Sequence, residues 1–102
     1  MNVGIVGISG YTGIELTRLL GAHPTLKLVM GAGATSAGRE LSAVWPALDG
    51  VIDLTIDPVN PERLIDRCDV VFLAMPHGHA ARLAPSLVAG GVTVVDLGAD
   101  FR

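Results

Sequence analysis

Three glycines, Gly7, Gly10 and Gly13, are spaced three residues apart in the segment GISGYTG, between an apolar run and an amphipathic run. Glycine lets a backbone turn sharply and approach a ligand closely, and free N–H groups at the start of a following helix favour an anion. Ser9 and Thr12 add hydroxyl donors to the same turn. The spacing is a variant of the dinucleotide fingerprint, so it predicts a turn that binds a pyrophosphate. In the alternative interpretation, the glycines serve only to pack a strand against a helix.

The next segment bears on which dinucleotide would bind. Sites for NAD usually carry an Asp or Glu at the end of the second strand, about 20 residues further on, where it holds the ribose hydroxyls. Residues 30–34 read MGAGA and contain no acid. The missing carboxylate removes a repulsion against the 2′-phosphate of NADP, and Thr35, Ser36 and Arg39 follow as candidate phosphate ligands. The sequence therefore favours NADP over NAD, although Arg39 also fits an ordinary solvated arginine.

Strands and helices must position these residues, and the apolar pattern predicts an alternating order of them. Short β-branched runs predict strands at residues 2–6, 26–30, 51–56, 70–74 and 92–97. Amphipathic or capped segments predict helices at residues 12–20, 60–67 and 79–89, with one or two helical turns within 41–48. Alternation over short links implies an α/β fold with a doubly wound parallel sheet, as in Rossmann-like domains. Such sheets bind ligands outside the carboxyl ends of their strands.

The helix signals lead to more detailed expectations. In residues 12–20 the apolar side chains are expected to be buried and the polar ones exposed. The first set is Ile14, Leu16, Leu19 and Leu20, and the second is Glu15, Thr17 and Arg18. Asn60 followed by Pro61 is typical of an N-cap with proline at the first helical position. Because Pro85 lies inside residues 79–89, that helix is expected to kink there or to begin later.

Composition narrows the class of protein. The chain has 102 residues, of which 50% are hydrophobic and 17% charged, so one folded domain over residues 1–102 is expected rather than disorder. A net charge of −3 argues against nucleic acid as a partner. No apolar run approaches the roughly 20 residues that span a bilayer, and no basic leader precedes the first strand, so a cytoplasmic protein without a membrane partner is expected. The single cysteine, Cys68, leaves no internal disulfide.

Four segments together resemble the N-acetyl-gamma-glutamyl-phosphate reductase family. They are GISGYTG at residues 7–13, TSAGR at 35–39, LAMPHG at 73–78 and DLGADFR at 96–102. They occur in the order and spacing of the family, over essentially the whole chain. The resemblance implies NADP-dependent reduction of N-acetyl-gamma-glutamyl phosphate, an acyl phosphate, to an aldehyde in arginine biosynthesis. It also implies a cytoplasmic two-domain enzyme that forms homo-oligomers.

The resemblance further implies which residues contact the cofactor and the substrate. The residues implied to line the pyrophosphate and the nearby cofactor are Gly7, Ser9, Gly10, Tyr11, Thr12 and Gly13. Those implied for the 2′-phosphate are Thr35 and Ser36, and those implied for the nicotinamide side are Pro76, His77 and Gly78. For His77, a direct chemical role and a role in shaping the turn both stay open. Arg102 is a candidate for holding the substrate phosphate. This chain departs from the family at Ala34, near which many members carry an arginine.

The nucleophilic cysteine and the assisting histidine of the family lie beyond the matched stretch, so no catalytic residue is assigned within this chain. Cys68 is expected at the amino end of its strand, about 17 Å from the carboxyl ends, and is interpreted as a packing residue. No metal site is predicted, because no cluster of ligands accompanies the histidines. The chain is therefore expected to bind the cofactor without turning over the substrate.

Two other functions stay open. A related reductase that acts on an aminoadipyl or aspartyl phosphate would keep the fold and the reaction type. A stand-alone nucleotide-binding module without catalysis is the second. Against the module, the apolar strand that contains residues 92–95 would be left as an exposed sheet edge, which favours aggregation.

Overall fold

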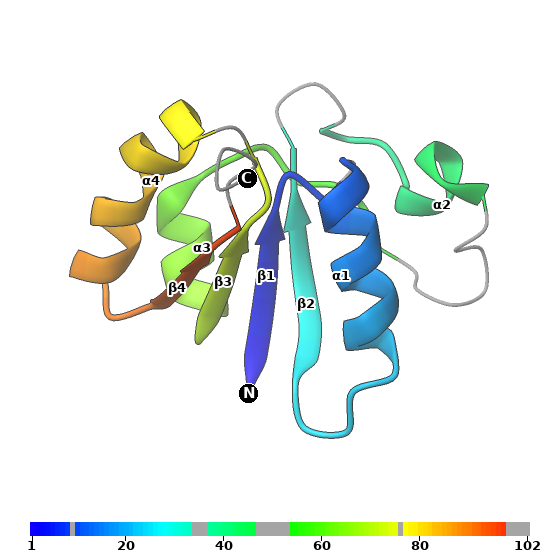
Figure 1. The fold of residues 1–102 in the computed structure, drawn as a ribbon, viewed down its shortest axis with the longest axis horizontal. Coiled ribbons are helices and arrows are strands. Elements are labelled where there is room, and N and C mark those ends of the chain that lie inside the picture. The colour runs from blue at the N-terminus through cyan, green and yellow to red at the C-terminus, as the bar shows by residue number, and fades with distance from the viewer. Residues whose placement is uncertain (9, 34–36, 47–53, 76, 98–102) are drawn as a thin grey trace.

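The computed structural model describes residues 1–8, 10–33, 37–46, 54–75 and 77–97. In this part of the chain, parallel strands form one sheet in the order β2-β1-β3-β4, and their arrows point the same way in Figure 1. The strands are β1 (Asn2–Val6), β2 (Lys27–Ala32), β3 (Val70–Leu73) and β4 (Thr93–Asp96). This architecture confirms the predicted α/β fold with a Rossmann-like parallel sheet. As expected, β4 is the last strand on its side of the sheet among the described residues.

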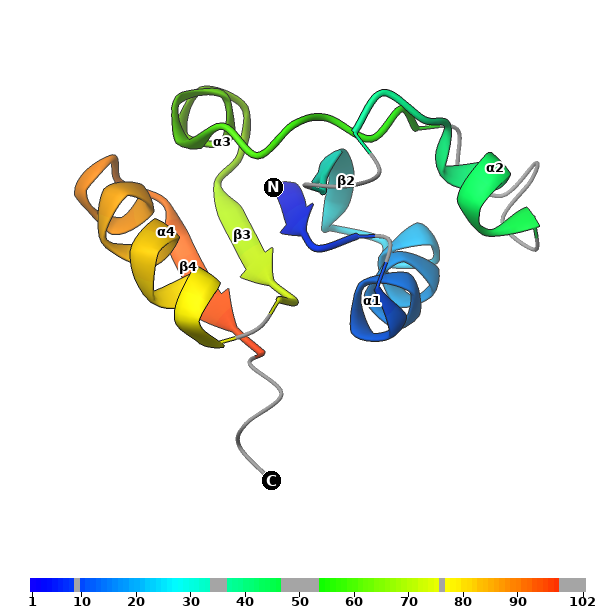
Figure 2. The same cartoon turned by 90° about the horizontal axis from the view of Figure 1, so that it is seen from above.

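Helices cover both faces of the sheet, as a doubly wound fold requires. Figure 2 shows α1 (Tyr11–Gly21) on one face and α3 (Pro61–Arg67) on the other. α4 (His77–Ala89) packs beside α3, and the short α2 (Leu41–Val44) lies towards the β2 side of the molecule. None of the helices in the described ranges is long and apolar enough to cross a membrane.

Each face of the sheet has its own hydrophobic core. On the α1 face, Ile5 from β1 and Ile14 from α1 pack with Leu41 from α2. On the opposite face, Leu64 from α3 and Leu87 from α4 belong to a second buried cluster. Because β1 contributes buried residues to both clusters, the sheet is covered on both sides along its centre. This rigid centre leads directly into the glycine turn.

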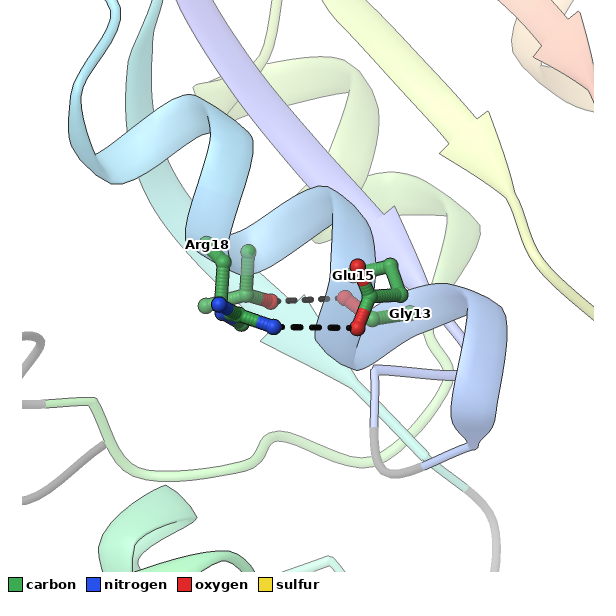
Figure 3. Close-up of polar contacts among 4 residues, drawn as sticks. Gly13, Glu15 and Arg18 are labelled. Carbon is green, nitrogen blue, oxygen red and sulfur yellow. Dashed lines mark hydrogen bonds and ion pairs between the residues drawn. The ribbon is translucent and has the colours of Figure 1, made fainter. Parts of the chain in front are cut away.

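The predicted faces of the first helix are wrong at two positions. Thr17 is fully buried and Leu19 is 68% exposed, the reverse of the expectation. The buried stripe follows Ile14, Thr17 and Leu20, which are spaced three residues apart, and Leu19 falls outside it. The Thr17 hydroxyl donates to Gly13 O at 2.8 Å, which satisfies the buried polar group. On the exposed side, Arg18 forms an ion pair with Glu15 (Figure 3).

The predicted strand at residues 51–56 is also wrong in the part that the structure describes. Residues 54–57 form only isolated bridges, one parallel between Asp57 and Ala32 and one antiparallel between Thr55 and Glu40. Asp57 lies beside the carboxyl end of β2, on the side where a third strand of a Rossmann-like sheet would lie. Residues 54–56 pair instead with residues 38–41, which run in the opposite direction, so the described segment forms no continuous ladder with β2. Residues 51–53 lie outside the described ranges.

The helices α3 and α4 match their sequence-based predictions to different degrees. Asn60 caps α3 as predicted, because its side chain accepts hydrogen bonds from the N–H groups of Glu62 and Arg63. α4 begins at His77, two residues earlier than predicted, and runs through Pro85 to Ala89. The expectation of a later start is therefore wrong. Buried leucines on both sides of the proline, Leu83 and Leu87, hold the helix against the sheet.

Candidate functional site

The glycine turn lies where three strands end side by side. Gly7 N donates to Ala32 O at the end of β2, at 2.8 Å, and Ala74 N beyond β3 donates to Val6 O at 2.9 Å. The turn therefore joins the carboxyl ends of β1, β2 and β3. Strand order reverses here, because the chain leaves β1 for β2 on one side and later returns to place β3 on the other. Ligands of open α/β sheets bind at such a reversal.

Two of the three glycines are required by close approach of the backbone. Gly7 has a φ of 85°, and a Cβ there would overlap the carbonyl oxygen of Ala74. A Cβ on Gly13 would overlap Gly7 O and lie 2.7 Å from Ile8 Cα. The N-terminal turn of α1 thus packs directly on the end of β1. The shortest contacts at both positions are therefore with backbone atoms.

The start of α1 has the properties of an anion site. The N-cap residue, Gly10, has no side chain that could accept a hydrogen bond from the first-turn N–H groups, and the first turn holds no acidic residue. Backbone N–H groups and the positive end of the helix dipole therefore remain available to an anion. Thr12 is exposed beside them. Ser9 lies outside the described residues, and only the backbone of Tyr11 is described.

The end of β2 agrees with the expected lack of an acid in the strand, but it brings in an acid from elsewhere. Asp57 N donates to Gly31 O at 2.8 Å, and Gly33 N donates to Asp57 O at 3.0 Å. The Asp57 carboxylate lies 4.0 Å from Arg63 Nη2. Sequence reasoning missed Asp57, although it follows the apolar run at residues 51–56. Its charge is offset by Arg63 on the α3 face.

Arg39 is held near the same edge by its backbone. Ile56 N donates to Arg39 O at 2.8 Å, so the segment that bridges to β2 also fixes this residue. The residue is exposed, and its side chain has no hydrogen-bond or ion-pair partner among the described residues. A free guanidinium at this place can bind a phosphate. Thr35 and Ser36, the other predicted phosphate ligands, lie outside the described ranges.

The remaining predicted site residues follow β3 and β4. His77 and Gly78 are the first residues of α4, which begins at the same edge of the sheet as α1 (Figure 1). Only their backbone is described. Pro76 and Arg102 lie outside the described residues. The structure thus brings the start of α4 to the edge that carries the glycine turn, on the β3 side.

Cys68 lies at the opposite edge, as predicted. It follows α3 and precedes β3, is 6% exposed, and belongs to the core on the α3 and α4 face. Burial raises the pKa of its thiol above the ordinary value of 9.0, so the group is protonated at neutral pH. Cys68 is therefore a packing residue. No three His, Cys, Asp or Glu side chains within the described ranges gather closely enough to hold a metal ion.

A surface pocket of about 360 Å³ also lies at this opposite edge, around the turn between α1 and β2. His23 organises the turn, because its Nδ1 accepts from the N–H groups of Thr25 and Leu26 at 3.1 and 3.0 Å. Lys27 lies on its rim. The hydrogen bonds of His23 thus stabilise the turn between α1 and β2. The pocket around this turn is separated from the glycine turn by the length of the sheet.

Comparison with known proteins agrees with this geometry. Residues 2–102 match the family model described as "Semialdehyde dehydrogenase, NAD binding domain". N-acetyl-gamma-glutamyl-phosphate reductase from Crocosphaera subtropica is 46% identical over 102 residues, which are the whole of this chain and 29% of that protein. The reductase of the same name from Cyanothece sp. is 51% identical over 98% of this chain and 28% of its own length. The chain thus spans less than a third of these relatives.

Solved structures support the fold. Aspartate semialdehyde dehydrogenase with NADP from Candida albicans superposes with a TM-score of 0.79 at 24% identity, covering 98% of this chain and 30% of that one. The Vibrio cholerae aspartate semialdehyde dehydrogenase II gives a TM-score of 0.76 at 18% identity, over 98% of this chain and 31% of that one. The resemblance inferred from the four sequence segments is confirmed by the relatives. This chain belongs to the family of semialdehyde dehydrogenase NAD-binding domains.

Proposed function

We propose that this chain is the NADP-binding portion of a reductase that converts N-acetyl-gamma-glutamyl phosphate to N-acetylglutamate semialdehyde in arginine biosynthesis. The observation that carries the proposal is the start of α1 at the switch point of the sheet, where the N-cap Gly10 and a first turn without acidic residues leave backbone N–H groups available to an anion. The reductases that share 42–51% of its residues support the choice of substrate. A related aminoadipyl or aspartyl-phosphate reductase is the alternative within the same reaction class.

In this proposal the chain binds and orients the cofactor. The N–H groups at the start of α1 hold the pyrophosphate, with Ser9, Gly10, Tyr11 and Thr12 beside it. Thr35, Ser36 and Arg39 bind the 2′-phosphate. Pro76, His77 and Gly78 border the nicotinamide, which supplies a hydride when bound. Arg102 holds the phosphate of the substrate.

The chemical groups that attack the acyl phosphate belong, in this proposal, to another part of the protein. The chain spans 28–30% of the reductases that it matches, and Cys68 is buried at the wrong edge of the sheet. Residues 1–102 then form one cofactor domain, and a thiolate and a histidine of a second domain carry out catalysis. The full-length enzyme is a cytoplasmic homo-oligomer, and the chain by itself is inactive.

Calorimetric titration of the 102-residue chain with NADPH and with NADH tests the cofactor assignment. We expect measurable binding of NADPH and weaker binding of NADH. Arg39→Ala should weaken NADPH binding by about tenfold while leaving NADH binding unchanged, because only NADPH offers the 2′-phosphate. Equal or tighter binding of NADH would contradict the preference for NADP. If neither NADPH nor NADH binds, the proposal as a whole is refuted.

A turnover assay tests the division of labour. With NADPH and N-acetyl-gamma-glutamyl phosphate, we expect the 102-residue chain to release no phosphate above the uncatalysed rate. Sustained NADPH-dependent release of phosphate would show that the chain carries its own nucleophile and would overturn this part of the proposal.

A further inference from the structure

An antiparallel ladder beside β2 contains two consecutive residues of opposite charge, Arg39 and Glu40. Glu40 lies directly opposite Thr55 in this ladder, while the neighbouring pair is joined by Ile56 N donating to Arg39 O. Side chains of directly opposed residues approach most closely where the two residues do not exchange backbone hydrogen bonds. Here Thr55 Oγ1 donates to Glu40 Oε1 at 2.5 Å. The hydroxyl therefore fixes the position of the carboxylate.

The residues of this ladder differ in burial. Leu41 and Ile56 are fully buried and pack in the cluster that contains Ile8 of the glycine turn. Arg39 and Glu40, which precede Leu41, are both exposed. The Glu40 carboxylate is held by the Thr55 hydroxyl, whereas the Arg39 side chain has no hydrogen-bond or ion-pair partner among the described residues.

We propose that the Thr55 hydroxyl is a positioning group that maintains the preference for NADP by holding the Glu40 carboxylate away from Arg39. The inference rests on the proposed function, in which Arg39 binds the 2′-phosphate. Because Arg39 directly precedes Glu40 in the chain, a released Glu40 side chain would compete for its guanidinium or repel the phosphate bound there. Within the described residues, Thr55 is the side chain that hydrogen-bonds Glu40. Loss of this one hydroxyl should therefore weaken binding of the 2′-phosphate and leave binding of the rest of the cofactor unchanged.

Thr55→Val tests the proposal, because it removes the hydroxyl and keeps the shape of the side chain. The measurement is the dissociation constant of the 102-residue chain for NADPH and for NADH. We expect the constant for NADPH to rise about threefold to tenfold, and that for NADH to change by less than about twofold. If the wild-type chain binds neither nucleotide, the proposed function fails, whereas normal wild-type binding with an unchanged ratio in the variant overturns only the present inference.

Matched variants separate positioning from general stability. Thr55→Ser keeps the hydroxyl and should bind both nucleotides as the wild type does. The double variant Thr55→Val with Glu40→Gln should regain NADPH affinity, because the released side chain is then neutral. If Thr55→Val does not fold, Glu40→Asp replaces it, since the shorter side chain keeps the charge but loses the contact with Thr55. Equal weakening of NADPH and NADH in these variants would show a merely structural role and overturn the inference.

Discussion

Replacement of Gly7 by alanine tests whether close approach of the backbone, rather than a positive φ alone, explains the glycine turn. Gly91 is the matched control, because its φ of 89° is almost the same as the 85° of Gly7. A Cβ on Gly91 meets nothing within 4 Å, whereas a Cβ on Gly7 overlaps the carbonyl oxygen of Ala74. The two variants therefore share the conformational cost and differ in the overlap.

The expected magnitudes follow from this comparison. Alanine in the left-handed region costs about 1–2 kcal/mol, partly offset in both variants by the lower freedom of the unfolded chain. Forcing a methyl group against a packed backbone costs about 1–3 kcal/mol more. We expect Gly91→Ala to lower the free energy of unfolding by about 1 kcal/mol and Gly7→Ala by about 3 kcal/mol.

Urea denaturation followed by far-ultraviolet circular dichroism measures both free energies, and titration with NADPH measures binding. Gly91→Ala should bind NADPH normally, because it lies in the turn before β4, at the amino edge of the sheet. Gly7→Ala should bind at least about tenfold more weakly, since the end of β3 must move. Equal destabilisation by the two substitutions would refute the argument from close approach.

Three further substitutions test other parts of the fold. Asn60→Ala should lower the free energy of unfolding by about 1 kcal/mol, because two N–H groups of α3 lose their acceptor, and Asn60→Asp should restore most of it. Pro85→Ala should raise the free energy of unfolding by about 1–2 kcal/mol, since alanine restores a missing helical N–H at an exposed position. A lower free energy of unfolding, measured by urea denaturation, would contradict this. Because burial raises the pKa of Cys68, the unfolded chain loses this proton first as pH rises above 9.0. Stability should then fall as pH rises through 9.0 towards the raised pKa of the folded state, and less steeply in Cys68→Ala.

Local patterns in the sequence were sufficient to predict most of the strands and helices. The strand β1 has the predicted bounds, and Asn60 caps α3 as expected, because both depend on residues adjacent in sequence. The glycine turn could be identified for the same reason. The end of α4 at Ala89 was predicted, but its start at His77 was not, because buried contacts of Leu83 and Leu87 with the sheet outweigh the cost of Pro85.

The errors fall where distant segments meet. Thr17 reads as a surface residue by type, but its own helix supplies an acceptor, so burial costs little. Residues 54–56 were predicted to be part of a regular strand, yet residues 54–57 are shared between β2 and a returning segment that the pattern does not indicate. The same pairing brings Asp57 beside β2 and Glu40 against Thr55. These contacts depend on tertiary structure, and therefore no local periodicity predicts them.

The position of β1 between β2 and β3 also sets an order of events during synthesis. β1 is synthesised before the other described strands of this sheet, and it pairs on one side with residues 27–32, which soon follow, but on the other side with residues 70–73. The N–H group of Asn2 bonds the carboxylate of Asp69, 67 residues away. Until that part of the chain has emerged, β1 has one unpaired edge, and closing such a long loop slows folding. The newly made chain therefore exposes the most buried of its described strands for longest, which is the interval in which a chaperone would protect it.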